Sequence, residues 1–86
     1  MIQERASIKN LRVGMKYSVD KWMNYGIGVI EIDRIDHESY NPPSWGYVKY
    51  SYYGRDNRMF GEVITINGLL QLLDAYNGRV HWTINA

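Results

Sequence analysis

Hydrophobic and polar residues alternate along much of this chain, and a period of two is typical of half-buried β-strands. Apolar side chains take every second position across residues 13–19, which predicts a first strand there. A second strand is predicted from about Ile27 to Asp36, with Ile32 on its apolar face. Ile35 is one position out of phase with that face, so we expect a β-bulge near Arg34.

The third predicted strand, Trp45 to Tyr53, is the centre of the predicted fold. It is rich in aromatic residues and contains no proline, as is usual for a strand inside a sheet. Alternation places Val48, Tyr50 and Tyr52 on one face. The other face then carries Trp45, Tyr47, Lys49, Ser51 and Tyr53. With aromatic rings on both faces, we expect one face to pack into a core and the other to be partly covered or to bind a partner.

A fourth strand is predicted at Met59–Thr65, where Gly61 indicates a bulge or a point of close packing. One helix follows near residues 66–76, because four large side chains recur at helical spacing: Leu69, Leu72, Leu73 and Tyr76. Thr65 or Asn67 is suited to begin this helix, and Asn77-Gly78 is suited to end it.

A closing strand is predicted from the alternation of Val80, Trp82 and Ile84, and it places Trp82 in the core. Residues 1–12 show no firm period, so a fraying tail, a short helix and an extra edge strand all stay open for them.

The predicted order is β-β-β-β-α-β, a mainly β class with five strands. Its connections are Asp20–Gly26, His37–Ser44, Gly54–Asn57 and the helical segment Ile66–Asn77. This order resembles a Src-homology-3-like small β-barrel. The resemblance implies a barrel over residues 12–85, with residues 1–11 as an N-terminal extension of a single domain, 1–86.

The signalling branch of that architecture has an acidic first loop and a paired-tyrosine motif, which this chain lacks, so binding of proline-rich peptides is not implied. Other branches bind methylated side chains, RNA, DNA or protein, and a shared fold does not choose among these.

Composition narrows the class of protein. Eighty-six residues suit one domain, and the chain is globular, with 45% hydrophobic and 22% charged residues. There is no cysteine, so disulfides and thiolate metal sites are excluded, which fits a cytoplasmic protein (the host cytoplasm for a viral one). No apolar run approaches a membrane span, and the N-terminus has no signal-peptide pattern.

The aromatic content is high, with eight tyrosines, three tryptophans and one phenylalanine. A tyrosine hydroxyl favours a rim or an interface, so we expect several rings at the surface. The leading hypothesis is a non-enzymatic binding module that docks onto a protein partner, as do small phage or mobile-element proteins that inhibit or redirect host machinery. Its predicted protein-binding residues are Trp22, Tyr25, Tyr40, Trp45, Tyr47 and Tyr53. Open strand edges also allow a homo-oligomer.

Two other binding functions stay open. A methyl-lysine cage of Trp22, Tyr25 and Tyr47 fits cation–π chemistry. An RNA- or DNA-binding small barrel is the alternative to protein binding, although a net charge of +1 limits its electrostatic attraction. Its predicted cationic residues are Lys21, Lys49, Arg55 and Arg58. A virion or oligomeric structural subunit is the third hypothesis.

An enzyme is not expected. The two histidines, His37 and His81, are far apart in sequence and fit no metal-ligand spacing. The Gly26-Ile27-Gly28 segment only weakly resembles a phosphate loop, because a strand follows it where a helix is needed. We therefore predict no catalytic residue, no metal site and no cofactor.

Overall fold

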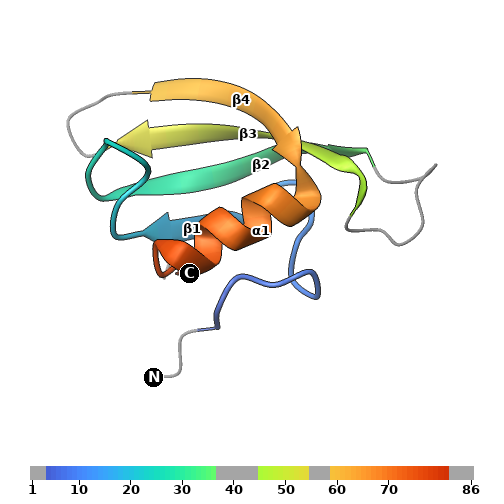
Figure 1. The fold of residues 1–86 in the computed structure, drawn as a ribbon, viewed down its shortest axis with the longest axis horizontal. Coiled ribbons are helices and arrows are strands. Elements are labelled where there is room, and N and C mark those ends of the chain that lie inside the picture. Colours follow the sequence, from blue (N-terminus) through green and yellow to red (C-terminus); the bar gives the residue numbers. More distant parts are fainter. Residues whose placement is uncertain (1–3, 37–44, 55–58, 82–86) are drawn as a thin grey trace, which may run out of the picture.

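The computed structural model describes residues 4–36, 45–54 and 59–81 (Figure 1). Its elements are β1 (Lys16–Val19), β2 (Gly28–Asp36), β3 (Tyr47–Gly54), β4 (Met59–Thr65), α1 (Ile66–Ala75) and β5 (Arg79–Val80). This is the predicted β-β-β-β-α-β order. The mainly β class is thus confirmed, with five strands and one helix in the part of the chain that the structure describes.

All five strands belong to one antiparallel sheet with the order β4-β3-β2-β1-β5. The outermost strands, β4 and β5, do not pair with each other within the described ranges, so the sheet is open. The closed barrel that the resemblance implies is therefore not confirmed.

The predicted bulge lies in β2, where the pairing with β3 shifts between Ile32 and Arg34. Asp33 is the extra residue, and its carboxylate accepts a hydrogen bond from the Ser51 hydroxyl at 2.6 Å. The shift returns Ile35 to the face that Ile32 occupies. The sequence prediction is confirmed here, and its physical reason is the need to bury Ile35.

Strands β3 and β4 pair in register over seven residues without a shift. The predicted bulge at Gly61 is therefore wrong. A side chain at this position would make only ordinary contacts, the nearest at 3.5 Å from the Tyr50 carbonyl oxygen, so Gly61 is not a point of close packing either.

One face of the sheet, which we call the inner face, forms the core together with α1. Figure 1 shows α1 lying across this face. Its fully buried side chains from the strands are Tyr17, Val19, Ile30, Ile32, Val48, Tyr50 and Tyr52, and those from α1 are Ile66, Leu69 and Leu73. The predicted division of β3 into two faces is confirmed, since Tyr47, Lys49 and Tyr53 are exposed.

Both ends of α1 are capped by side chains or backbone turns that the sequence indicates. The Thr65 hydroxyl accepts a hydrogen bond from the Gly68 amide at 3.0 Å. At the other end Asn77 takes a left-handed conformation (φ 58°), and the Gly78 amide donates to the Leu73 carbonyl, which is the Schellman arrangement. Among the residues placed by the structure, no helix has the length and apolar character needed to cross a bilayer.

Residues 4–6 of the N-terminal segment lie along β5 without forming a strand, and residues 8–10 form a turn, so none of the three alternatives describes this segment fully. The Val80 amide donates to the Glu4 carbonyl at 2.8 Å, and the Ala6 amide donates to the Gly78 carbonyl at 3.1 Å. A single bridge pairs Arg5 with Arg79. The β5 edge of the sheet is thereby covered.

Asn10 is a buried polar residue that fixes this segment to the core. Its amide group donates to the Glu4 carboxylate at 2.9 Å and to the Arg5 carbonyl at 2.8 Å. Its side-chain oxygen accepts from the Ser7 amide at 3.1 Å and from the Tyr17 hydroxyl at 2.7 Å. Burial raises the pKa of Tyr17 to about 12.

We expect Gly28→Ala to destabilise the fold. A methyl group there would lie 2.6 Å from the Tyr52 ring and 2.6 Å from the Tyr53 carbonyl oxygen, and overpacking of this kind costs about 1–3 kcal/mol. Gly26→Ala is the matched control, because a methyl group there meets nothing within 4 Å. Chemical denaturation of both variants checks this, and equal stabilities would contradict it.

We expect stability to fall as the pH rises from about 10 to about 12, with Tyr17 as one cause. Tyrosine in an unfolded chain ionises near pH 10, whereas burial raises the pKa of Tyr17 to about 12 in the fold. Between these values the unfolded chain has lost a proton that the folded chain keeps, so stability decreases by up to about 1.4 kcal/mol per pH unit. Tyr17→Phe should flatten this dependence in denaturation curves, and an unchanged slope would contradict it.

Candidate functional site: the outer face of β3 and β4

Four exposed apolar side chains lie on the face of the sheet opposite α1, one pair near each end of β3 with Ser51 and Gly61 between the pairs, and we call this group the β3–β4 patch. It consists of Tyr47 (44% exposed), Tyr53 (40%), Met59 (66%) and Val63 (63%). The strand register places them on one face, because Tyr53 pairs with Met59 and Lys49 pairs with Val63. Trp45, 64% exposed, comes two residues before β3 at the Tyr47 end.

The sequence dictates this patch by alternation in two neighbouring strands. In β3 the odd-numbered residues leave the core, and in β4 Met59, Gly61 and Val63 lie on that same face. The sequence prediction included the β3 residues and missed Met59 and Val63. Alternation along residues 59–65 places both side chains on the outer face, once β4 is known to pair with β3.

Charged side chains adjoin the patch on β2. Arg34 and Lys49 are direct cross-strand neighbours on the outer face, and both are exposed. A small hollow of about 140 Å³ lies between them and is lined also by Asp36, Tyr47 and Val63. The surroundings of the patch are therefore mixed in sign, with cations and carboxylates side by side.

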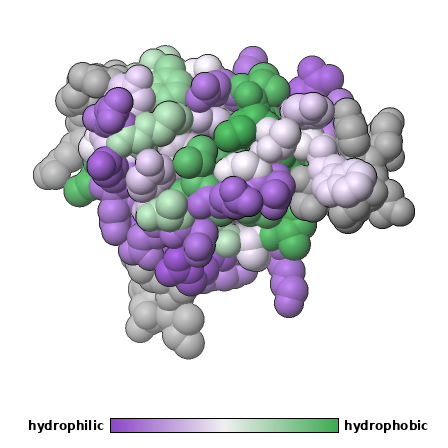
Figure 2. Space-filling view, viewed as in Figure 1, coloured by the Kyte–Doolittle hydropathy of each residue, from purple (hydrophilic) through white to green (hydrophobic). Residues whose placement is uncertain are grey.

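The face that carries α1 differs from this one. Figure 2 shows that face, on which hydrophobic and hydrophilic side chains are interspersed. Of the large apolar side chains that the structure finds exposed outside the β3–β4 region, Ile8, Val13 and Ile27 come from separate segments of the chain.

The prediction that Trp22 is a docking residue is wrong, because its side chain is 0% exposed. Its indole nitrogen donates to the Tyr50 hydroxyl at 3.2 Å, and its ring meets that of Tyr76 edge-on at 5.7 Å. A tight turn causes this burial: paired hydrogen bonds between Trp22 and Tyr25 fold the loop back, with Met23 in a left-handed conformation (φ 55°).

The Tyr50 hydroxyl in turn donates to the Glu62 carboxylate at 2.7 Å. Burial, followed by this hydrogen bond, raises the pKa of Tyr50 above the usual tyrosine range. The chain Trp22–Tyr50–Glu62 therefore connects the β1–β2 turn to β3 and β4.

Tyr25 is half-buried and packs against the rings of Tyr52 (5.4 Å between centroids) and Phe60 (5.0 Å) on the inner side of the sheet. Tyr47 lies on the outer face. The predicted methyl-lysine cage of Trp22, Tyr25 and Tyr47 is therefore wrong, because its members lie in the core and on opposite sides of the sheet.

Of the cations predicted for nucleic-acid binding, Lys21 and Lys49 are exposed but are not brought together. Lys21 lies beyond the Gly28 end of β2, whereas Lys49 pairs with Arg34. Gly28 and Arg34 are separated along β2 by roughly 20 Å, at about 3.3 Å per residue. The remaining predicted site residues, Tyr40, Arg55 and Arg58, lie outside the described residues, as does Trp82.

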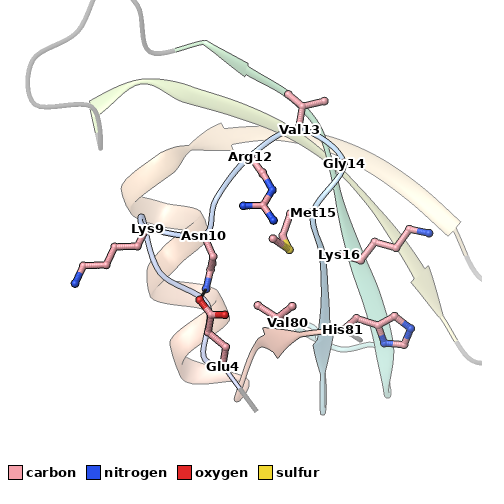
Figure 3. A pocket seen from close by; sticks show the side chains of 10 residues that line it. All are labelled: Glu4, Lys9, Asn10, Arg12, Val13, Gly14, Met15, Lys16, Val80 and His81. Atoms are coloured by element: carbon pink, nitrogen blue, oxygen red, sulfur yellow. Dashed lines mark hydrogen bonds between the residues drawn. The ribbon is translucent and has the colours of Figure 1, made fainter. Parts of the chain in front are cut away.

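A hollow of about 510 Å³ lies between the N-terminal segment and β1 (Figure 3). Arg12 points into it beside Met15, whereas Lys9 and Lys16 point away from it. The cations therefore do not converge on one ligand position.

The ring nitrogen Nδ1 of His81 and the Ser18 hydroxyl are hydrogen bonded at 2.7 Å on the outer face. Within residues 4–36, 45–54 and 59–81, no three histidine, aspartate or glutamate side chains are grouped as metal ligands would be.

Comparison with known proteins finds no match to this chain among protein-family models, curated proteins or solved structures. Inference about its function therefore depends on the geometry of its own residues.

We expect alanine substitution to destabilise the fold strongly at Trp22 and hardly at all at Trp45, the two tryptophans among the described residues. Trp22→Ala should lower the free energy of unfolding by about 3–5 kcal/mol, because it empties a buried ring site. Trp45→Ala should change it by no more than about 0.5 kcal/mol, because that ring is mostly exposed. Urea denaturation of both variants checks this, and a large loss for Trp45→Ala would place that ring in the core.

Proposed function

We propose that this chain is a non-enzymatic binding module that docks onto a protein partner through the β3–β4 patch and Trp45. The observation that supports it is the number of large exposed apolar residues in one region: Trp45 and the four residues of the β3–β4 patch all come from residues 45–63. Clusters of this kind on a soluble domain mark interaction surfaces.

The residue types support a protein partner. Tryptophan and tyrosine are enriched among the residues that contribute most to protein–protein affinity, because they bury a large rigid surface. Here Trp45, Tyr47 and Tyr53 supply such rings, and Met59 adds an adaptable side chain. A rigid sheet holds the strand residues in fixed positions, which limits the entropy lost on docking.

The charges near the patch argue against nucleic acid as the first choice. Arg34 and Lys49 are paired cations beside Tyr47, and the exposed carboxylates Asp33 and Asp36 lie close to Arg34 along β2. A net charge of +1 adds little long-range attraction to phosphate. Nucleic-acid binding is therefore the second proposal, supported by the pairing of these two cations beside Tyr47.

We also propose that the fold is of the Src-homology-3-like kind. The position of β5 beside β1 and the helix before β5 support that resemblance, while closure into a barrel remains part of the proposal.

We expect substitutions in the patch to abolish partner binding without unfolding the chain. Tyr53→Ala and Val63→Ser should each weaken the complex by about 30-fold or more, as loss of a hot-spot residue does. Ile8→Ser, which alters an exposed apolar residue in the N-terminal segment at the other edge of the sheet, is the matched control and should bind as the wild type does.

The measurement has two steps. The immobilised chain captures candidates from cells, and each purified candidate is then titrated against the wild type and the variants by calorimetry. A partner that binds all variants equally contradicts the proposal. Capture that disappears after nuclease treatment, with affinity falling steeply as salt rises, also contradicts it and favours the nucleic-acid alternative.

A further inference from the structure

The two edges of the sheet are treated differently by the chain. At the β5 edge, the N-terminal segment covers the strand with hydrogen bonds from Val80 and to Gly78. At the other edge, β4 pairs only with β3 among the residues that the structure describes. Figure 1 shows β4 along the upper border of the sheet with no described segment beyond it.

β4 lacks most of the features by which proteins protect an open edge. Those features are proline, a bulge, a very short strand, a covering segment, and charged side chains, above all lysine or a charge that points inward. β4 is seven residues long, Met-Phe-Gly-Glu-Val-Ile-Thr, contains neither proline nor lysine, and pairs with β3 without a bulge. Its one charged residue, Glu62, lies on the inner face, where it accepts the hydrogen bond from Tyr50. Among the described residues, no segment other than β3 forms backbone hydrogen bonds with β4.

We infer that β4 receives an extended segment of the partner protein as an added strand. This inference rests on the proposed function, because the free edge of β4 borders the patch at Met59 and Val63. Strand addition supplies affinity through backbone hydrogen bonds, and alternate side chains supply specificity. The added strand also continues the outer face, so its outward side chains lie beside the patch.

Glu62 defines the chemistry of the incoming segment. It is the fourth of seven residues, it is exposed, and Phe60 and Ile64, both half-buried, flank it on the inner face. A residue placed opposite Glu62 on an added strand would be a direct cross-strand neighbour, where opposite charges are favourable. The segment therefore carries lysine or arginine at that position, with apolar residues two positions before and after it.

The same residue disfavours a second copy of this chain as the occupant. In the register that pairs all seven β4 residues of two copies, Glu62 of one copy would face Glu62 of the other. Like charges directly opposite each other destabilise a strand pair. A segment of different sequence avoids this conflict.

The test uses the full chain and a phage-displayed library of random nine-residue peptides. We expect selection on the wild type to enrich peptides with a lysine or arginine flanked two positions away by apolar residues. Glu62→Gln is the matched control, because its amide oxygen still accepts from Tyr50 while the charge is removed. Selection on this variant should lose the basic residue and keep the apolar ones.

The best wild-type peptide is then synthesised for titration. Replacing its basic residue by glutamine should weaken binding to the wild type by up to about fivefold and leave binding to Glu62→Gln unchanged. Alternate backbone nitrogens of a bound peptide strand point to opposite sides, so only one set can hydrogen bond to β4. We expect methylation of that set to abolish binding and methylation of the other set to be tolerated.

The outcomes separate this inference from the proposed function. Strand addition is overturned if both sets of methylated peptides still bind, or if the library yields no binding peptide. If Tyr53→Ala nevertheless abolishes partner binding, the proposed docking through the β3–β4 patch is retained. A free protein that light scattering shows to be a dimer, with slowed amide exchange in β4, also overturns it. If patch variants leave partner binding intact, the proposed function itself fails.

Discussion

The hydroxyl of Tyr50 is the point on which much of this fold depends. It accepts a hydrogen bond from the Trp22 indole and donates one to the Glu62 carboxylate, so one buried atom connects the β1–β2 turn, β3 and β4. A buried hydroxyl without such partners would cost stability. Two other inner-face tyrosines follow the same rule, since Tyr17 donates to Asn10 and Tyr52 donates to the Gly26 carbonyl at 2.9 Å. Among the described residues no buried side-chain polar atom lacks a partner.

These hydroxyl partners explain where prediction from the sequence succeeded and where it failed. Strands β2 to β4, the bulge in β2 and the ends of α1 follow from local patterns: alternation, one residue out of phase at Ile35, and capping residues at Thr65 and Asn77. The first strand is shorter than alternation predicts, because it begins at Lys16 after a turn at residues 13–14. The position of Trp22 does not follow from any local pattern. It depends on a tight turn and on a hydroxyl acceptor that comes from Tyr50, 28 positions away.

The expectation that tyrosines gather at the surface was right for one face of β3 only. A small domain can enclose several tyrosines when polar groups such as Asn10, Gly26 and Glu62 are placed to bond their hydroxyls. Those partners lie 7 to 26 positions away in the sequence, at no fixed spacing that would indicate them. By contrast, the exposure of the Tyr47 and Tyr53 rings follows from the alternation of side chains along a single strand. The alternation of side chains along β3 therefore predicted the candidate site better than the aromatic content did.

The hydrogen bond from Tyr50 to Glu62 gives the free edge of β4 a connection to the interior. The carboxylate that faces this edge is two hydrogen bonds away from the indole of Trp22, whose ring is completely enclosed. The same hydroxyl oxygen thus serves the enclosed indole and the exposed carboxylate, so the free edge of β4 and the deepest ring of the core share one atom.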